Sequence, residues 1–203
     1  GAFLLAAGEV LAERIAGAGT PRAEALRAVA GACLFGVDRD PLAAAMEGVF
    51  INHYGDKCPK IYIMEPHQAA CYYDSGVAND GSARSVDGDM DSIMAGLACG
   101  VPNPISWEII RNFADGFFSC SDVLTANGMR ILGNPLAGDP RVVAGESGAV
   151  GTGLVDEIMK RRPDISAEIG LNESSRVIMF STEGDTDTQN YRDIVWYGKY
   201  PRV

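Results

Sequence analysis

The stretch CLFGVDRDPLAAAMEGVFINHYGDKCPKIYIME, residues 33–65, decides the fold. It begins and ends with short apolar runs, CLFGVD at 33–38 and KIYIME at 60–65, which predict buried strands. Between them, Asp40 and Pro41 favour a helix start, because Asp caps free N–H groups and Pro suits the first helical position. A strand, a helix and a strand joined by short connections predict a parallel strand pair.

The rest of the chain continues this alternation of helices and strands. Helices are predicted from apolar spacing at residues 3–19, 21–32, 91–100, 103–116, 121–133 and 147–163, and strands at 116–121 and 176–181. The pattern predicts an α/β fold with one mostly parallel sheet flanked by helices.

Composition describes a globular chain of ordinary size. The 203 residues are 47% hydrophobic and 22% charged, which is enough to bury a core. A net charge of −10 argues against binding nucleic acid, because an acidic surface repels phosphate. No apolar run approaches the roughly 18 residues of a membrane helix, and the opening residues lack the basic start of a secretory signal. We therefore expect no membrane or nucleic-acid partner and a cytoplasmic location.

The residues that commonly bind metals do not form a recognisable site. The five cysteines contain no Cys-x-x-Cys pair and predict reduced, mostly buried thiols, with a Cys71–Cys99 disulfide as the alternative. His53 and His67, the only histidines, match no ligand spacing, so we assign them surface or core roles. No metal is predicted.

Three alternating carboxylates, Asp87, Asp89 and Asp91, superficially resemble a calcium-binding loop. Ser92 and Ala98 stand where such a loop needs Gly and Glu, so calcium is not expected. We predict instead that Asp89 or Asp91 caps the helix predicted at 91–100.

Two motifs have the character of a ligand site. The strand predicted at 176–181 ends in two hydroxyls, Ser181 and Thr182, followed by the acidic turn EGDTD. The segment GESGAVGTG at 145–153 leads into a helix, where free N–H groups attract anions and small residues allow a ligand to approach closely. Close packing of a helix on a sheet is the alternative explanation of these glycines.

Three longer segments together resemble a known family. They are DMDSIMAGLACGVPNPISWEIIRNFADGFFSCSD, GMRILGNPLAGDPRVVAGESGAVG and FSTEGDTDTQNYRDIVWYGKYPR, and they look like the carboxy-terminal part of diaminopropionate ammonia-lyase. That family uses pyridoxal phosphate and has the tryptophan-synthase β-like fold, fold type II. The resemblance covers about residues 42–202. It implies a partial fold type II domain that eliminates ammonia from 2,3-diaminopropionate.

The resemblance also implies which residues bind the cofactor. Ser181 with Thr182 takes the position whose hydroxyl hydrogen-bonds the pyridine nitrogen, and a neutral hydroxyl suits β-elimination because it cannot keep that nitrogen protonated. The cofactor would be lined from the other side by Gly145, Glu146, Ser147 and Gly148. Glu146 is a candidate for orienting the cofactor or a small amino-acid substrate.

Two expected parts of the family pattern have no match in this sequence. The family's Schiff-base lysine belongs to its amino-terminal half, and Lys57, Lys60, Lys160 and Lys199 match no such motif, so no catalytic residue is assigned. The family's glycine-rich phosphate-binding turn is replaced by GVDRDPLAAAM at 36–46.

The first forty residues have a resemblance of their own. GAFLLAAGEVLAERI and ACLFGVDRDPLA look like the S-adenosylmethionine-binding start of an adenine-specific DNA methyltransferase, which implies that Asp38 binds ribose hydroxyls. We therefore expect a methyltransferase-like segment at 1–41 and an incomplete lyase-like domain at 42–203, as in a chimera. A noncatalytic α/β scaffold and a methyltransferase remnant are the alternatives to a lyase. We also expect a homo-oligomer, because an open site face favours self-association.

Overall fold

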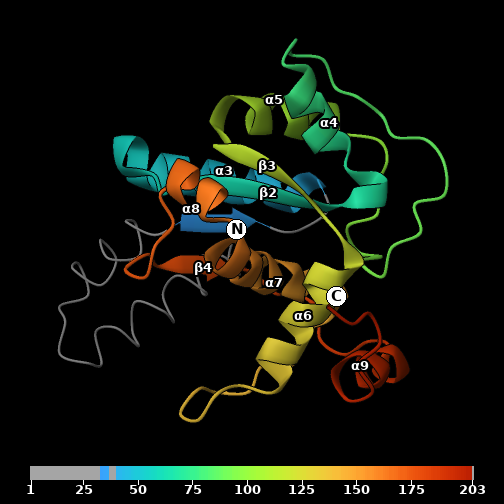
Figure 1. Cartoon of the computed structure of the whole chain (residues 1–203). Helices are drawn as coiled ribbons and strands as arrows, with labels where there is room; N and C mark the ends of the chain where they lie inside the picture. The colour runs from blue at the N-terminus through green and yellow to red at the C-terminus, as the bar shows by residue number, and fades with distance from the viewer. Residues whose placement is uncertain (1–32, 37–39, 203) are drawn as a thin grey trace.

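A four-stranded parallel sheet forms the centre of the molecule (Figure 1). The computed structural model describes residues 33–36 and 40–202, with side chains from Ala43 onward. The strands lie in the order β3-β2-β1-β4 and are β1 (Cys33–Gly36), β2 (Ile61–Pro66), β3 (Gly116–Cys120) and β4 (Val177–Met179). Helix α3 (Asp40–Tyr54) joins the parallel neighbours β1 and β2, which confirms the predicted strand-helix-strand unit.

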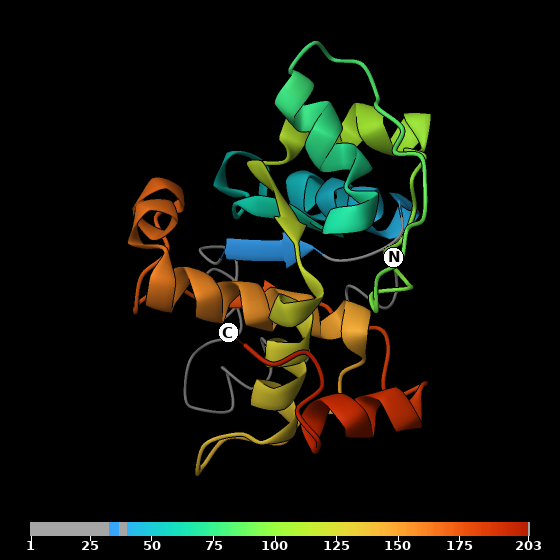
Figure 2. The same cartoon turned by 45° about the vertical axis from the view of Figure 1, so that its right-hand side comes forward.

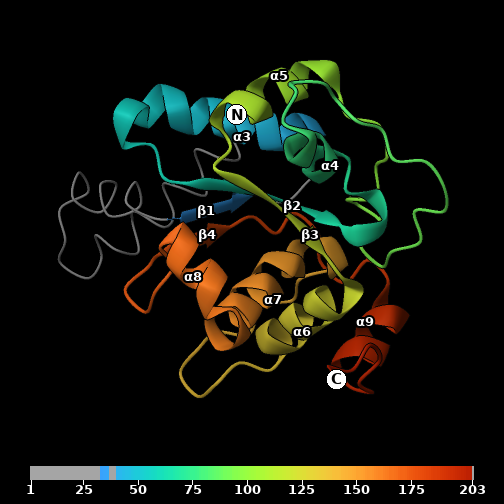
Figure 3. The same cartoon turned by 45° about the horizontal axis from the view of Figure 1, so that its top comes forward.

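Helices cover both faces of the sheet (Figure 3). One face carries α3, α4 (Cys71–Ala78) and α5 (Pro104–Phe113), and the other carries α6 (Asp122–Gly133), α7 (Glu146–Arg161) and α8 (Pro163–Ile169). Two short 3-10 turns, η1 (Gly55–Lys57) and η2 (His67–Ala69), flank β2. Helix α9 (Thr188–Val195) lies beside α6 (Figure 2). The α/β class expected from the sequence is confirmed.

The central strand β2 separates two hydrophobic core clusters. Ile61 and Ile63 pack with α3 and α5, whereas Tyr62 and Met64 pack with α7. All six residues of β2 are buried, as a parallel strand covered on both faces requires. The continuous apolar run in the sequence therefore has a direct structural cause.

The helix predicted at 91–100 is absent, and that prediction is wrong. The segment forms turns and coil, so neither Asp89 nor Asp91 caps a helix there. Met94 and Leu97 are 0% and 6% exposed and lie in the core cluster between the sheet and α7. Met94 and Leu97 are three residues apart, which is the spacing of neighbours on one face of a helix. In the structure they are buried because the coil packs against the core, not because they share a helical face.

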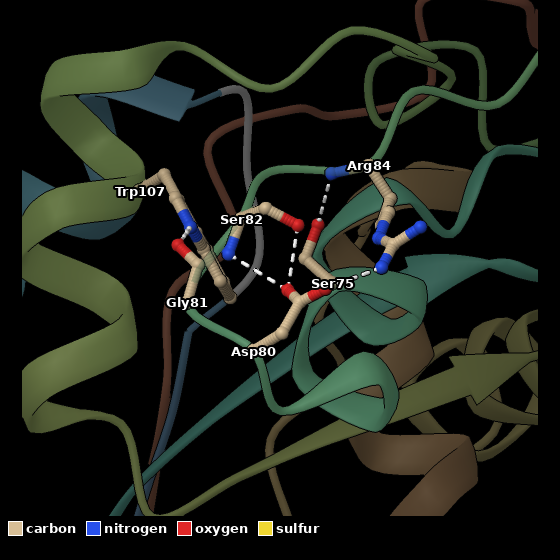
Figure 4. A network of polar contacts seen from close by, with 6 residues as sticks. All are labelled: Ser75, Asp80, Gly81, Ser82, Arg84 and Trp107. Carbon is tan, nitrogen blue, oxygen red and sulfur yellow. Dashed lines mark hydrogen bonds and ion pairs between the residues drawn. The ribbon is translucent and has the colours of Figure 1, made fainter.

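Polar contacts fix the long connection between α4 and α5, to which this segment belongs. Figure 4 shows its beginning, with Ser75, Asp80, Gly81, Ser82, Arg84 and Trp107 in one network. The Asp80 carboxylate accepts from the Ser82 backbone N–H at 2.9 Å and from the Arg84 guanidinium at 2.5 Å. The Trp107 indole donates to the Gly81 carbonyl at 3.0 Å. Further along, the Ser92 hydroxyl donates to a carboxylate oxygen at the start of α6 at 2.7 Å.

Helices α6 and α7 cross at very short range. A Cβ added to Gly153 would overlap the carbonyl oxygen of Leu124, and one added to Gly128 would overlap that of Ala149. Glycine at both positions lets the two backbones touch. The crossing fixes the position of α7, whose first turn contributes to the candidate site.

The cysteines and histidines have ordinary surroundings in the described chain. Cys71 is a thiol whose Sγ lies 3.3 Å from the carbonyl oxygen of Cys99, and no disulfide joins these two residues. His53 and His67 are exposed. Within residues 33–36 and 40–202, no group of three metal-ligating side chains is placed to hold an ion. None of the described helices has the length and apolar character needed to cross a membrane.

Candidate functional site

The candidate site lies at the carboxyl edge of the sheet, where β4 ends and α7 begins. In open parallel α/β sheets, ligands bind at this edge, because the loops that follow the strands gather there. Phe180 is buried as the last apolar residue of the run, and Ser181 is exposed immediately after it. The predicted change from buried strand to exposed hydroxyl is therefore present.

Ser181 rests against a glycine at the start of α7. A Cβ at Gly148 would overlap the Ser181 Oγ, so no other side chain fits there without movement. The Ser181 hydroxyl donates to the carbonyl oxygen of Glu183 at 3.2 Å, and the Gly145 N–H donates to the same oxygen at 3.0 Å. The turn after β4 is thus bonded to the residue that precedes α7.

Ser147 has a buried hydroxyl that faces Gly96. Its side-chain oxygen has no hydrogen-bond partner in the described part of the chain, although the residue is only 8% exposed. A Cβ at Gly96 would lie 2.8 Å from that oxygen, so a larger residue at this position would require the Ser147 hydroxyl to turn away. The coil at 91–100 therefore forms one wall of the site.

Glu146 is the first residue of α7 and is 7% exposed. Its Oε1 accepts a hydrogen bond from the Asn190 side-chain Nδ2 at 2.6 Å. Its backbone carbonyl accepts from the Thr125 hydroxyl. A carboxylate at the amino end of a 16-residue helix is electrostatically favourable, because the helix dipole is positive there.

Five of the residues predicted for the site are brought together. Ser181, Gly145, Glu146, Ser147 and Gly148 share one edge of the sheet. Thr182 is exposed one residue beyond Ser181. Asp38 lies outside the described residues, as do most of the first forty residues, whose resemblance to a methyltransferase stays a prediction.

Sequence reasoning missed two residues that contact the predicted set. Gly96 was assigned to a helix, and only its close approach to Ser147 reveals its place. Asn190 lies 44 positions from its partner Glu146, and no local pattern indicates such a contact. The site therefore combines the Ser181 hydroxyl, the Glu146 carboxylate and the amino end of α7 at the carboxyl edge of the sheet.

Comparisons with known proteins show which proteins this chain resembles. No family model matches the sequence. The chain is 46% identical over 161 residues to diaminopropionate ammonia-lyase of Escherichia coli K12, and 46% identical over 160 residues to that of Salmonella typhimurium LT2. Each match covers 77–78% of this chain and 40% of the relative. The chain thus spans less than half the length of these relatives.

Solved structures show the same similarity. The Escherichia coli ammonia-lyase in complex with D-serine superposes with a TM-score of 0.74 at 41% identity, over 83% of this chain and 42% of that one. The same enzyme with an aminoacrylate-PLP azomethine intermediate gives 0.73 at 42% identity, over the same shares. Threonine deaminase isoform 2 from Solanum lycopersicum, at 15% identity and a TM-score of 0.59, shares the fold alone. Over more than three quarters of its length, this chain is therefore a relative of diaminopropionate ammonia-lyase in both sequence and fold.

Proposed function

We propose that this chain carries the ring-nitrogen side of a pyridoxal phosphate site in a lyase that releases ammonia from 2,3-diaminopropionate. The observation that carries the proposal is the position of Ser181, an exposed hydroxyl that directly follows the buried end of the β4 run and lies against Gly148 at the start of α7. The relatives that match 78% of the chain act, by name, on diaminopropionate. The solved relative with a PLP-bound intermediate supports the choice of cofactor.

The described residues fit the pyridine side of this cofactor. Pyridoxal phosphate supplies an electron sink for cleavage of bonds next to an amino-acid α-carbon. The Ser181 hydroxyl would turn from the Glu183 carbonyl to donate to the ring nitrogen, and it would not protonate that nitrogen, because a hydroxyl is neutral at ordinary pH. Glycine at 145 and 148 lets the start of α7 pack closely against the turn after β4, because a Cβ at either position would overlap atoms of that turn. Glu146 would face the ring or the substrate from the start of α7.

The same proposal includes a boundary between two segments of the chain and a homo-oligomeric state. Residues 42–203 would be the lyase-like part and residues 1–41 a methyltransferase-like segment, as in a chimera, with β1 of the first segment joined to β2 and β4 in one sheet. The relatives extend well beyond the matched region, because it covers only 40% of their length. We propose that the protein acts in the cytoplasm on a small amino acid and forms a homo-oligomer.

Ligand titration tests the site directly. The probe is 4′-deoxypyridoxine phosphate, which has the cofactor's ring and phosphate but no aldehyde, so surface lysines cannot capture it. We expect weak but saturable binding by the parent chain, because the family's phosphate-binding turn is replaced in this sequence, and about tenfold weaker binding by Ser181→Ala, as for loss of one hydrogen bond. Ser174→Ala, in the turn before β4 at the opposite edge of the sheet, is the matched control and should bind like the parent.

Two results would contradict the proposal. One is a parent chain that shows no saturable binding up to millimolar probe. The other is equal affinity in the Ser181→Ala and Ser174→Ala variants. Either result would favour the noncatalytic scaffold as the function of this chain.

A further inference from the structure

Helix α9 and the segment after it form a hydrogen-bonded chain that ends on Glu146. The Asn190 Nδ2 donates to the Glu146 Oε1 at 2.6 Å, and the Asn190 Oδ1 accepts from the Lys199 Nζ at 2.9 Å. The three side chains come from α7, α9 and the chain's last residues. Figure 2 shows α9 next to the beginning of α7, beside α6.

The outer end of this hydrogen-bonded chain is itself held in place. The Arg130 guanidinium donates to the carbonyl oxygens of Ile194 and Tyr200, each at 3.0 Å, and also to that of Lys199. The Lys199 Nζ lies 5.2 Å from the centroid of the Tyr200 ring, a favourable place for a cation. Lys199 is therefore fixed by its backbone and by its ammonium group.

Hydrogen-bond chemistry fixes the orientation of the amide between these two charged groups. A lysine ammonium can only donate, and an ionised carboxylate can only accept. The Asn190 oxygen must therefore face Lys199, and its NH₂ group must face Glu146. If the amide were rotated by half a turn, its NH₂ group would face the Lys199 ammonium, also a donor, and its oxygen would face the Glu146 carboxylate, also an acceptor.

We propose that Asn190 is a positioning residue for Glu146, and that Lys199 sets the orientation of the Asn190 amide. The proposal rests on the proposed function in one respect, the place of Glu146 beside the cofactor. Glu146 precedes Ser147 and Gly148, which contact Gly96 and Ser181. Holding the Glu146 carboxylate therefore holds the first turn of α7 in the arrangement that the site needs.

Amide hydrogen exchange tests the contact without any cofactor. Asn190→Asp keeps the size of the side chain but places an oxygen where Glu146 needs a donor. We expect the buried amides of Ala149 and Val150, in the first turns of α7, to exchange about tenfold faster in this variant. The double variant Glu146→Gln with Asn190→Asp exchanges donor and acceptor, and should restore the parent rate. Gln189→Leu is the control, because Gln189 donates to Asp193 within α9.

Probe binding tests the consequence for the site. We expect Asn190→Asp to bind 4′-deoxypyridoxine phosphate about tenfold more weakly than the parent and Gln189→Leu to bind equally. We expect Lys199→Met to weaken probe binding by a smaller factor, since the Asn190 amide then loses the hydrogen bond from Lys199 but keeps the one to Glu146. The double variant should recover slow exchange but not affinity, because the carboxylate is gone.

The outcomes are distinguishable. Unchanged exchange in Asn190→Asp, or no recovery in the double variant, would overturn the positioning role. Recovery of both exchange and affinity would show that the Glu146 carboxylate is not needed, which overturns its place beside the cofactor. A parent chain that does not bind the probe counts against the proposed function alone, and the exchange rates still decide the role of Asn190.

Discussion

A carboxyl group in α3 is buried without a hydrogen-bond partner among the described residues. Glu47 is 0% exposed, and neither of its carboxyl oxygens has a hydrogen-bond partner in the described part of the chain. Burial, followed by the nearby Asp115 carboxylate, raises the pKa of Glu47 from 4.5 to about 8. Cys58 lies in the same surroundings, and its thiol pKa is raised by burial and by these two carboxylates. Glu47 is therefore protonated in the folded protein at neutral pH.

The raised pKa makes the free energy of unfolding depend on pH. The folded chain binds the Glu47 proton more tightly than the unfolded chain does. The stability that this proton contributes is therefore fully present below pH 4.5 and is lost as pH rises to about 8. Each pH unit across this window removes about 1.4 kcal/mol, so at most about 3 kcal/mol is lost by pH 7. We expect Glu47→Gln, which never ionises, to match the parent near pH 4.5 and to exceed it by up to that amount at pH 7.

Urea unfolding at several pH values measures this difference. Trp107 is buried in the core cluster that contains Met46, next to Glu47 in the sequence, so its fluorescence reports unfolding of this region. Glu168→Gln on α8 is the control, because that side chain is exposed and should leave the pH profile unchanged. The reasoning is wrong if the advantage of Glu47→Gln over the parent is the same at pH 5 and pH 8.

Three further predictions concern packing, lysine chemistry and assembly. Gly153→Ala should lower the free energy of unfolding by about 1–3 kcal/mol in urea titrations, because its Cβ would overlap a carbonyl of α6, whereas Gly48→Ala has open space and should stabilise α3 by up to about 1 kcal/mol. Borohydride reduction with pyridoxal phosphate should leave no single, stoichiometrically modified lysine, and one uniquely labelled peptide in mass mapping would contradict this. Light scattering should show dimers or larger species, and a strict monomer that binds no hydrophobic dye would refute self-association.

The sequence predicted elements whose signals are local. The run at β2 is apolar at every position but Glu65, and it is buried on both faces. Asn103 and Pro104 mark the start of α5 in the usual way, because the Asn103 side chain accepts from the N–H groups of Ile105 and Ser106 at 2.9 and 3.2 Å. The glycines before α7 and the hydroxyl after β4 were also visible as patterns, and the fold brings them together.

Elements that depend on distant residues could not be predicted. Helix α4 has no local cap; instead the Glu65 carboxylate at the end of β2 accepts from the N–H groups of Tyr72 and Tyr73 at 3.1 and 2.8 Å. No helix-start pattern places the capping residue so far before the helix. Asn190 and Glu146 likewise meet only because α9 packs against the start of α7. Contacts of this kind are set by the tertiary structure, which periodicity does not record.

The way Arg130 holds the end of the chain has a consequence for sequence divergence. Its guanidinium contacts main-chain oxygens, at Ile194, Lys199 and Tyr200, and every amino acid supplies such an oxygen. Substitutions at Ile194 or Tyr200 therefore leave these bonds available, whereas no substitution of Arg130 offers the same fork of donors. In a set of natural variants, we therefore expect Arg130 to be invariant, while the residues at positions 194 and 200, whose carbonyl oxygens it contacts, vary freely.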